Sequence, residues 1–279
     1  MKVGILGGGR MGSGIAHAFL LAGDDVTVIE QDDSTADAAA HRIRESITRS
    51  VERGATERDA TGLADAFRTG TDPSSFAACE LVIEAVPEDR ALKTDALSRI
   101  ETAAPDAAIA TNTSSISIDD LAAALARPER FIGLHFFNPV PSSALVEIVA
   151  GSATAAELVE RASSWVESLG KTPIVVRDSP GFASSRLGLV LALEAIRMLD
   201  SGVASAEDID RAMELGYRHP IGPLRTTDIV GLDVRLGIAE ELHATLGERF
   251  APPALLRRLV AEGRLGRKSG AGFYEWETP

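Results

Sequence analysis

The sequence predicts an α/β protein in which a doubly wound sheet is followed by a smaller all-α domain. Short apolar segments rich in Val and Ile alternate with longer segments of helical periodicity up to about residue 176. A glycine-rich turn, Gly7-Gly8-Gly9, joins the first apolar segment to the first helical one. The strand pattern ends near Asp178-Ser179-Pro180-Gly181, and only helical periodicity follows. Strands that alternate with helices are typical of a parallel sheet covered on both faces.

The first domain is expected to span residues 1–178. Nearly continuous apolar runs indicate buried parallel strands, which are expected at residues 2–6, 25–29, 80–85, 108–111, 130–135, 145–149 and 173–176. Apolar residues at helical spacing predict helices over residues 11–22, 35–53, 92–104 and 155–169. The pattern leaves the direction of the last strands open.

The second domain, residues 179–279, is expected to be all-α and to contribute to the substrate site and to dimerisation. Helical periodicity covers residues 182–200, 205–215, 231–246 and 252–262, and Ser205 precedes an acidic first turn as an N-cap residue does. A domain of about 100 residues has several apolar faces to bury, and packing against a second copy would cover them. We therefore expect a homodimer formed through this domain.

Charge and composition narrow the class of protein. The net charge of −13 argues against a general nucleic-acid or membrane-surface binder. The single Cys79 excludes an internal disulfide and suits a reducing compartment. No apolar run approaches the roughly 20 residues that span a bilayer, and the first strand begins too early for a signal segment. A cytoplasmic protein is expected.

The glycine-rich turn carries a dinucleotide-binding pattern. The segment Gly7-Gly8-Gly9-Arg10-Met11-Gly12 contains G-x-G-x-x-G between a predicted strand and a predicted helix, which is the context that the motif requires. In this pattern the first glycine permits the tight turn, the second lets the backbone approach the pyrophosphate, and the third lets helix and strand pack closely. Free N–H groups of the helix then bind the phosphates. A Rossmann-type dinucleotide site is predicted, in preference to a glycine-rich turn without a ligand.

Glu30 ends the second predicted strand, about 20 residues beyond the glycines. A carboxylate at this place accepts hydrogen bonds from the ribose hydroxyls and repels a 2′-phosphate. No arginine follows immediately to accommodate that phosphate. The cofactor is therefore predicted to be NAD rather than NADP.

Three further segments place polar residues at the ends of strands, where open α/β sheets bind ligands. They are residues 111–115, residues 135–139 and Glu147, which lies inside the apolar segment of residues 145–149. A charge inside such a strand is unfavourable unless it is paired, and His135 is a candidate partner. Imidazole is a common base near neutral pH, and a carboxylate partner fixes its tautomer. A catalytic His135–Glu147 pair is predicted, with a satisfied core histidine as the structural alternative.

The chain resembles the L-3-hydroxyacyl-CoA dehydrogenase family, which includes bacterial 3-hydroxybutyryl-CoA dehydrogenases. The Gly-Leu-His-Phe-Phe-Asn-Pro-Val-Pro segment at residues 133–141 is highly specific. The other matching segments are residues 7–16, 83–88, 112–115, 179–182, 222–223, 231–233 and 266–274. The resemblance implies reversible oxidation of the 3-hydroxyl group of an acyl-CoA thioester, with NAD as hydride acceptor.

The resemblance also implies roles for individual residues. His135 would be the general base, and Glu147 would orient and stabilise it. Ser114 would hydrogen-bond the substrate oxygen near the nicotinamide. Asn138 would contact the nicotinamide end of the cofactor. Glu88, Lys93 and Lys268 match positions that lie beside the cofactor in the family. The structural alternatives are an ion pair at the start of a helix for Glu88 and Lys93, and a solvated lysine in a turn for Lys268.

The second predicted helix offers a site for the polyanionic CoA tail. Arg42, Ser46, Arg49 and Arg53 lie at offsets of 4, 7 and 11 residues, so they share one helical face. The resemblance assigns CoA contact to Ser46 and Arg53, and Arg49 is their neighbour. An exposed face tied to nearby acids such as Glu45 is the alternative.

Ser185 breaks the family pattern. Members carry Pro-Gly-Phe-x-x-Asn-Arg at the start of the second domain, and here the active-site Asn is Ser185. A hydroxyl is shorter than an amide and has one donor, so the substrate site is either weakened or retuned. Residues 54–70 form a linker that is short for the family. Because this region borders the acyl-CoA in the family, the preferred acyl chain length stays open.

Two other functions stay open. A dehydrogenase of a free 3-hydroxy acid, such as the related gulonate dehydrogenases, shares the His/Glu pair but needs no CoA helix. A non-catalytic NAD-binding protein could also keep this fold, although the retained Ser114, His135, Asn138 and Glu147 oppose it. The remaining histidines show no metal-ligand spacing and no metal is expected; they are His17, His41, His219 and His243.

Overall fold

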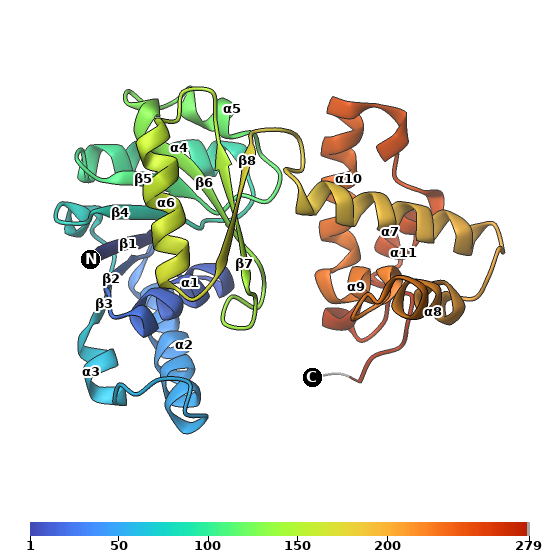
Figure 1. Ribbon diagram of the computed structural model, residues 1–279, viewed down its shortest axis with the longest axis horizontal. Helices are drawn as coiled ribbons and strands as arrows, with labels where there is room; N and C mark the ends of the chain where they lie inside the picture. The colour runs from blue at the N-terminus through green and yellow to red at the C-terminus, as the bar shows by residue number, and fades with distance from the viewer. Residues whose placement is uncertain (278–279) are drawn as a thin grey trace. The chain divides into compact units, whose positions relative to one another are not determined.

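The described part of the chain, residues 1–277, folds into two compact units in a computed structural model (Figure 1). The first unit is Met1–Asp178, an α/β unit built on a single sheet. The second begins at Ser179, and in its described residues, 179–277, the regular elements are helices. The predicted fold class is confirmed.

Within residues 1–277, one eight-stranded sheet has the order β3-β2-β1-β4-β5-β6-β7-β8. Neighbouring strands in the β3-β2-β1-β4-β5-β6 part of the sheet are parallel. β7 is antiparallel to β6, and β8 is parallel to β7. The order reverses between β1 and β4, which is the switch point where such sheets bind ligands. The strands are β1 (Lys2–Leu6), β2 (Asp25–Ile29), β3 (Phe67–Gly70), β4 (Leu81–Glu84), β5 (Ala108–Thr111), β6 (Phe131–Phe136), β7 (Leu145–Ala150) and β8 (Thr172–Arg177).

Alternating side chains place different residues on the two faces of the sheet. Val3, Ile5 and Leu134 belong to a core shared with α1 (Arg10–Ala22), α2 (Asp33–Glu52) and α6 (Ala156–Ser168). The alternate residues face away from this core, and there α5 (Ile118–Ala122) packs on β6. Helix α4 (Arg90–Ala103) packs on β4, β5 and α5. His135 and Glu147 alternate with residues of the first core and so occupy the other face.

The sequence prediction missed elements between residues 54 and 70. That segment was expected to be a linker, but it forms α3 (Ala60–Asp65) and β3, which pairs with β2. β3 has four residues, FRTG, of which Phe67 alone is buried, so it lacks the apolar run of a central strand. An edge strand needs only one buried face, which explains the weak signal.

The helical unit consists of α7 (Ser184–Asp200), α8 (Ala206–Tyr217), α9 (Pro223–Val230), α10 (Leu232–Leu246) and α11 (Ala254–Ala261). Its core includes Leu189, Leu193, Leu224 and Leu242. Helix α9 was not predicted. It starts with Pro223 at its first position, as prolines often do, but its sequence PLRTTDIV has little apolar periodicity.

Two buried acids hold the C-terminal segment against these helices. Asp228 accepts hydrogen bonds from the backbone N–H groups of Phe273 and Tyr274 and from Trp276 Nε1, at 2.9, 2.9 and 2.7 Å. Asp210 accepts one from the Tyr274 hydroxyl at 2.8 Å. Burial, together with this bond to Asp210, raises the pKa of Tyr274. The two carboxylates therefore fix a segment whose aromatic side chains, Phe273, Tyr274 and Trp276, also pack on the core of the helical unit.

Candidate active site

The glycine turn has the geometry of a phosphate-binding loop. Gly7 has φ +98°, a conformation that L side chains rarely adopt. A Cβ atom at Gly12 would lie 1.8 Å from the Gly7 carbonyl oxygen, so no side chain fits between the loop and α1. A Cβ atom at Gly9, the N-cap of α1, would meet no protein atom within 4 Å. The loop is thus closed toward the protein and open at Gly9, as a pyrophosphate ligand requires.

Glu30 follows β2 and lies beside this loop. Its Oε1 accepts a hydrogen bond from the backbone N–H of Gly8 at 2.7 Å. The Gly8 carbonyl oxygen accepts from Ser13 Oγ at 2.6 Å and from Arg42 Nη2 at 2.8 Å. Arg42 was predicted to share the CoA face of α2, but its guanidinium is turned to the glycine loop instead.

A buried ion pair lies at the end of β4. Lys93 Nζ, on α4, is 2.8 Å from Glu84 Oε1 and 3.4 Å from Glu88 Oε2, and the side chains of Lys93 and Glu84 are 1% and 0% exposed. Burial raises the pKa of Glu84, although the Lys93 ammonium and the hydroxyl of Thr111 oppose this effect. Lys93 is therefore held by protein carboxylates. Sequence reasoning missed Glu84, which it had placed inside an ordinary strand.

Glu88 organises the loop that follows β5. Its Oε1 accepts hydrogen bonds from the Thr113 hydroxyl at 2.6 Å and from the backbone N–H groups of Ser114 and Ser115 at 2.9 and 3.1 Å. Burial acts to raise the pKa of Glu88, but the Lys93 ammonium and these donors outweigh it, so the pKa lies below its usual value. One carboxylate thus places Ser114 at the ligand-binding edge of the sheet.

His135 and Glu147 lie directly opposite each other on the antiparallel strands β6 and β7. His135 Nδ1 is 2.7 Å from Glu147 Oε2. The Glu147 side chain is 0% exposed and that of His135 is 7% exposed. The expected partnership between the intrastrand acid and the histidine is therefore present in the structure. A carboxylate at this distance fixes the orientation of an imidazole ring.

Neighbouring contacts fix the chain on either side of His135. The Asn112 side-chain carbonyl, after β5, accepts a hydrogen bond from the backbone N–H of Phe136 at 2.9 Å. The loop after β6 carries the exposed Asn138. Lys171 Nζ donates to the carbonyl oxygens of Val140 and Ser143 in the same loop, at 2.7 and 2.6 Å. The loop is thereby held from the start of β8.

The predicted CoA residues lie on the second half of α2 and at its end. Ser46 is half-buried, and its hydroxyl donates to the backbone carbonyl of Arg42 at 2.9 Å. Arg49 is 60% exposed and lies 3.6 Å from Glu45, while Arg53 is the exposed C-cap residue. The structure therefore places Ser46 and two exposed arginines near one end of this helix.

Ser185 and Lys268 belong to the helical unit. Ser185 is half-buried in the first turn of α7. Lys268 Nζ forms an ion pair with Asp233 Oδ2 at 2.6 Å, beside Gly231. Lys268 is 45% exposed, so this pair lies near the surface.

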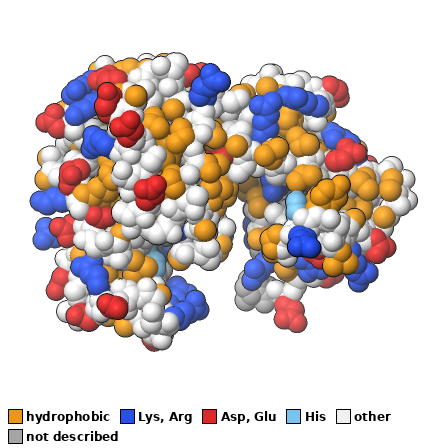
Figure 2. Space-filling view, viewed as in Figure 1, with side chains coloured by type: hydrophobic (Ala, Val, Ile, Leu, Met, Phe, Trp, Pro, Cys, Tyr) orange, Lys and Arg blue, Asp and Glu red, His pale blue; other side chains and the backbone are white. Residues whose placement is uncertain are grey.

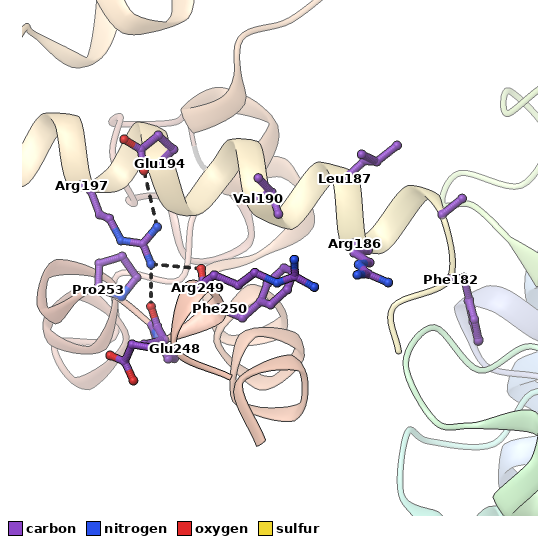
Figure 3. Close-up of a pocket in the computed structure, with 13 residues that line it drawn as sticks. Phe182, Arg186, Leu187, Val190, Glu194, Arg197, Glu248, Arg249, Phe250 and Pro253 are labelled. Atoms are coloured by element: carbon purple, nitrogen blue, oxygen red, sulfur yellow. Dashed lines mark hydrogen bonds and ion pairs between the residues drawn. The ribbon is translucent and has the colours of Figure 1, made fainter. Parts of the chain in front are cut away.

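The helical unit also contains a cavity of about 880 Å³ between α7 and residues 248–253 (Figure 3). Arg186, Leu187 and Val190 line it from α7. Arg197 points across the cavity in Figure 3, and its Nη2 donates to the carbonyl oxygen of Ala251 at 3.0 Å. None of the residues predicted from the sequence to form the active site lines this cavity. Among residues 1–277, no His, Cys, Asp or Glu cluster is arranged to hold a metal ion.

The comparisons with known proteins agree with this fold. Residues 2–179 match the family described as 3-hydroxyacyl-CoA dehydrogenase, NAD binding domain, and residues 181–276 match its C-terminal domain. A probable 3-hydroxybutyryl-CoA dehydrogenase of Deinococcus radiodurans is 43% identical, over 99% of this chain and 100% of its own length. A 3-hydroxybutyryl-CoA dehydrogenase of Mycobacterium tuberculosis is 41% identical, over 99% of this chain and 98% of its own.

A solved structure extends the likeness to three dimensions. The crystal structure of (S)-3-hydroxybutyryl-CoA dehydrogenase from Ralstonia eutropha superposes with a TM-score of 0.94 at 39% identity, covering 99% of each chain. The fold and loop define an NAD-binding dehydrogenase. More narrowly, the chain belongs to the 3-hydroxyacyl-CoA dehydrogenase family.

Proposed function

We propose that the protein oxidises the 3-hydroxyl group of an (S)-3-hydroxyacyl-CoA, such as 3-hydroxybutyryl-CoA, to the 3-oxo thioester, reversibly and with NAD. The single observation that carries this proposal is the buried His135–Glu147 pair, 2.7 Å apart, at the ligand-binding edge of a sheet whose glycine loop suits a dinucleotide. NAD, when bound, supplies the acceptor for the hydride that leaves carbon 3. Family membership and the relatives' names support the thioester as substrate.

In the proposed mechanism, His135 Nε2 takes the proton of the substrate hydroxyl as the hydride leaves. Nδ1 is held by Glu147, so the carboxylate fixes the ring and stabilises the imidazolium that forms. Ser114 donates a hydrogen bond to the same substrate oxygen. Its backbone N–H donates to Glu88 at 2.9 Å, and its hydroxyl, which donates to the same carboxylate at 3.3 Å, would turn to the substrate oxygen when the substrate binds.

The proposed cofactor contacts run from the loop to the β5 and β6 edges. The backbone of Gly7, Gly8, Gly9, Arg10, Met11 and Gly12 receives the pyrophosphate, and Glu30 receives the adenosine ribose. Asn138 contacts the nicotinamide end. Glu88 and Lys93 complete this side of the site, and Lys93 acts chiefly by neutralising Glu84 and Glu88, because its ammonium is buried between them. Lys268 is proposed to reach the cofactor from the helical unit.

The CoA tail is proposed to bind along α2. Ser46, Arg49 and Arg53 supply a hydroxyl and two cations, and Arg49 is 60% exposed and so accessible to the phosphates of CoA. The attraction between these two arginines and the CoA phosphates has to overcome the repulsion from the net charge of −13, and salt screens that local attraction. Binding of acyl-CoA is therefore expected to weaken with added salt.

We further propose a cytoplasmic homodimer that assembles through the helical unit. Leu187, Val190 and Leu191 of α7 are 66%, 44% and 41% exposed, and Val230 and Val234 add 41% and 43%. Figure 2 shows apolar side chains among the charged ones on the visible face of this unit. Among residues 1–277, no helix is long and apolar enough to cross a membrane. Equilibrium sedimentation at micromolar concentrations tests the dimer, and a monomer would contradict it.

One assay separates the candidate functions. NADH oxidation is followed with acetoacetyl-CoA, and then with free acetoacetate and a keto sugar acid. Oxidation with the thioester alone supports the proposal. Oxidation with the free acids alone favours a gulonate-dehydrogenase-like enzyme, and no oxidation with any of them favours a non-catalytic NAD-binding protein.

Ser185 is proposed to determine how well the site suits a short acyl group. Removal of one oriented hydrogen bond from the transition state costs about 1–3 kcal/mol. If Ser185→Asn raises kcat/KM for acetoacetyl-CoA about tenfold or more, the natural site is weakened for that substrate. If the variant gains nothing or loses activity, the site is tuned to a different acyl chain.

A further inference from the structure

Arg42 is a charged side chain of α2 that the proposed reaction does not yet use. It is half-buried, and its Nη2 donates to the Gly8 carbonyl oxygen at 2.8 Å. Its Nε lies 3.4 Å from Ser13 Oγ, and Ser13 Oγ itself donates to the Gly8 carbonyl oxygen at 2.6 Å. One carbonyl oxygen of the glycine loop therefore accepts two hydrogen bonds, one of them from a cation.

This contact determines the direction of the next peptide N–H. In a trans peptide the C=O and the following N–H point in opposite directions across a rigid plane. Because Arg42 and Ser13 hold the Gly8 oxygen toward α1 and α2, the Gly9 N–H points to the opposite side. Gly9 itself borders open space, because a Cβ atom built on it would meet no protein atom within 4 Å.

We propose that Arg42 is a positioning residue of the dinucleotide site, which aims the Gly9 N–H at the pyrophosphate by holding the Gly8 carbonyl group. The inference rests on the proposed placement of the pyrophosphate on residues 7–12. Glu30 holds the same residue from its other side, through the N–H of Gly8 at 2.7 Å. The loop is thus held between an acid after β2 and a cation on α2, through hydrogen bonds that a charge strengthens.

The test compares Arg42→Met with Arg44→Met, a matched control that removes an exposed cation two residues away on the same helix. Isothermal titration measures binding of NADH, ADP-ribose and adenosine. We expect Arg42→Met to raise the Kd of NADH and ADP-ribose about tenfold, with adenosine changed less than twofold. Arg44→Met is expected to leave all three within twofold, and Arg42→Lys to recover part of the loss.

A second measurement needs no ligand. Amide NMR of the unliganded protein is expected to show a shifted Gly9 N–H in Arg42→Met but not in Arg44→Met, with melting temperatures close to that of the parent. If Arg42→Met binds NADH within twofold of the parent, or weakens adenosine as much as ADP-ribose, the inference is wrong.

Gly9→Val distinguishes this failure from failure of the proposed site. Its Cβ atom would meet no protein atom within 4 Å, and the side chain would occupy the proposed place of the pyrophosphate. Loss of NADH binding in Gly9→Val with normal binding in Arg42→Met would overturn the role of Arg42 alone. Normal NADH binding in Gly9→Val would overturn the pyrophosphate placement, and with it both proposals.

Discussion

Replacing Glu147 by Gln removes one negative charge from the buried pair and keeps the size of the side chain. Nδ1 of His135 and Oε2 of Glu147 are 2.7 Å apart, and the Glu147 side chain is 0% exposed. With the centres of charge about 4 Å apart and an effective dielectric constant of about 20, the carboxylate stabilises an imidazolium by about 4 kcal/mol. Gln keeps a hydrogen-bonding group, so the expected loss in kcat is about a hundred- to thousandfold.

The assay is the initial rate of NAD reduction with saturating (S)-3-hydroxybutyryl-CoA, the direction in which the imidazolium forms, together with the Kd for NADH and the melting temperature. Glu160→Gln, on the exposed surface of α6, is the matched control and should retain the full rate. The Kd for NADH should be unchanged in both variants, because Glu147 lies away from the glycine loop in the sheet order. A folded Glu147→Gln enzyme that loses less than tenfold in kcat would refute the role of Glu147.

Three further changes test the rest of the site. Glu30→Ala should raise the Kd for NAD about tenfold and reduce the discrimination against NADP. Titration with each dinucleotide measures both effects, and unchanged discrimination would contradict the ribose contact. Combined Arg49→Glu and Arg53→Glu should raise KM for acetoacetyl-CoA and reduce its salt dependence, and an unaltered KM would rule out CoA binding on α2. The pKa of Glu88 is lowered in the folded protein, so its contribution to stability is complete above the unfolded value near 4.5 and is lost as pH falls through the folded value. Melting temperatures below pH 4.5 should therefore fall less steeply for Glu88→Gln than for the parent, and parallel curves would contradict this.

The sequence predicted those parts of the fold and site that depend on local pattern. The glycine loop, the acid that follows β2 and the intrastrand Glu147 each stand out from the apolar residues around them. Pairing of Glu147 with His135 followed from the cost of burying a lone charge, and the structure places them opposite each other. The cofactor and substrate roles of these residues remain proposals.

Other features depend on contacts between distant segments, which local pattern does not record. Arg42 was grouped with Arg49 by helical spacing, but the packing of α2 on the glycine loop turns it to Gly8. Glu84 lies inside the strand predicted for residues 80–85, and only the fold places Lys93 of α4 against it. Asp228 lies in the polar segment that forms the unpredicted helix α9. Its hydrogen-bond partners are 45 to 48 residues away in the sequence, so local pattern could not indicate its role.

The rate of NAD reduction with (S)-3-hydroxybutyryl-CoA in His135→Ala tests the central mechanism most directly. If His135 is the general base, this variant should bind NADH as the parent does and lose more than about a hundredfold in kcat. A folded His135→Ala protein that binds NADH and retains more than about a tenth of the parent kcat would contradict the mechanism.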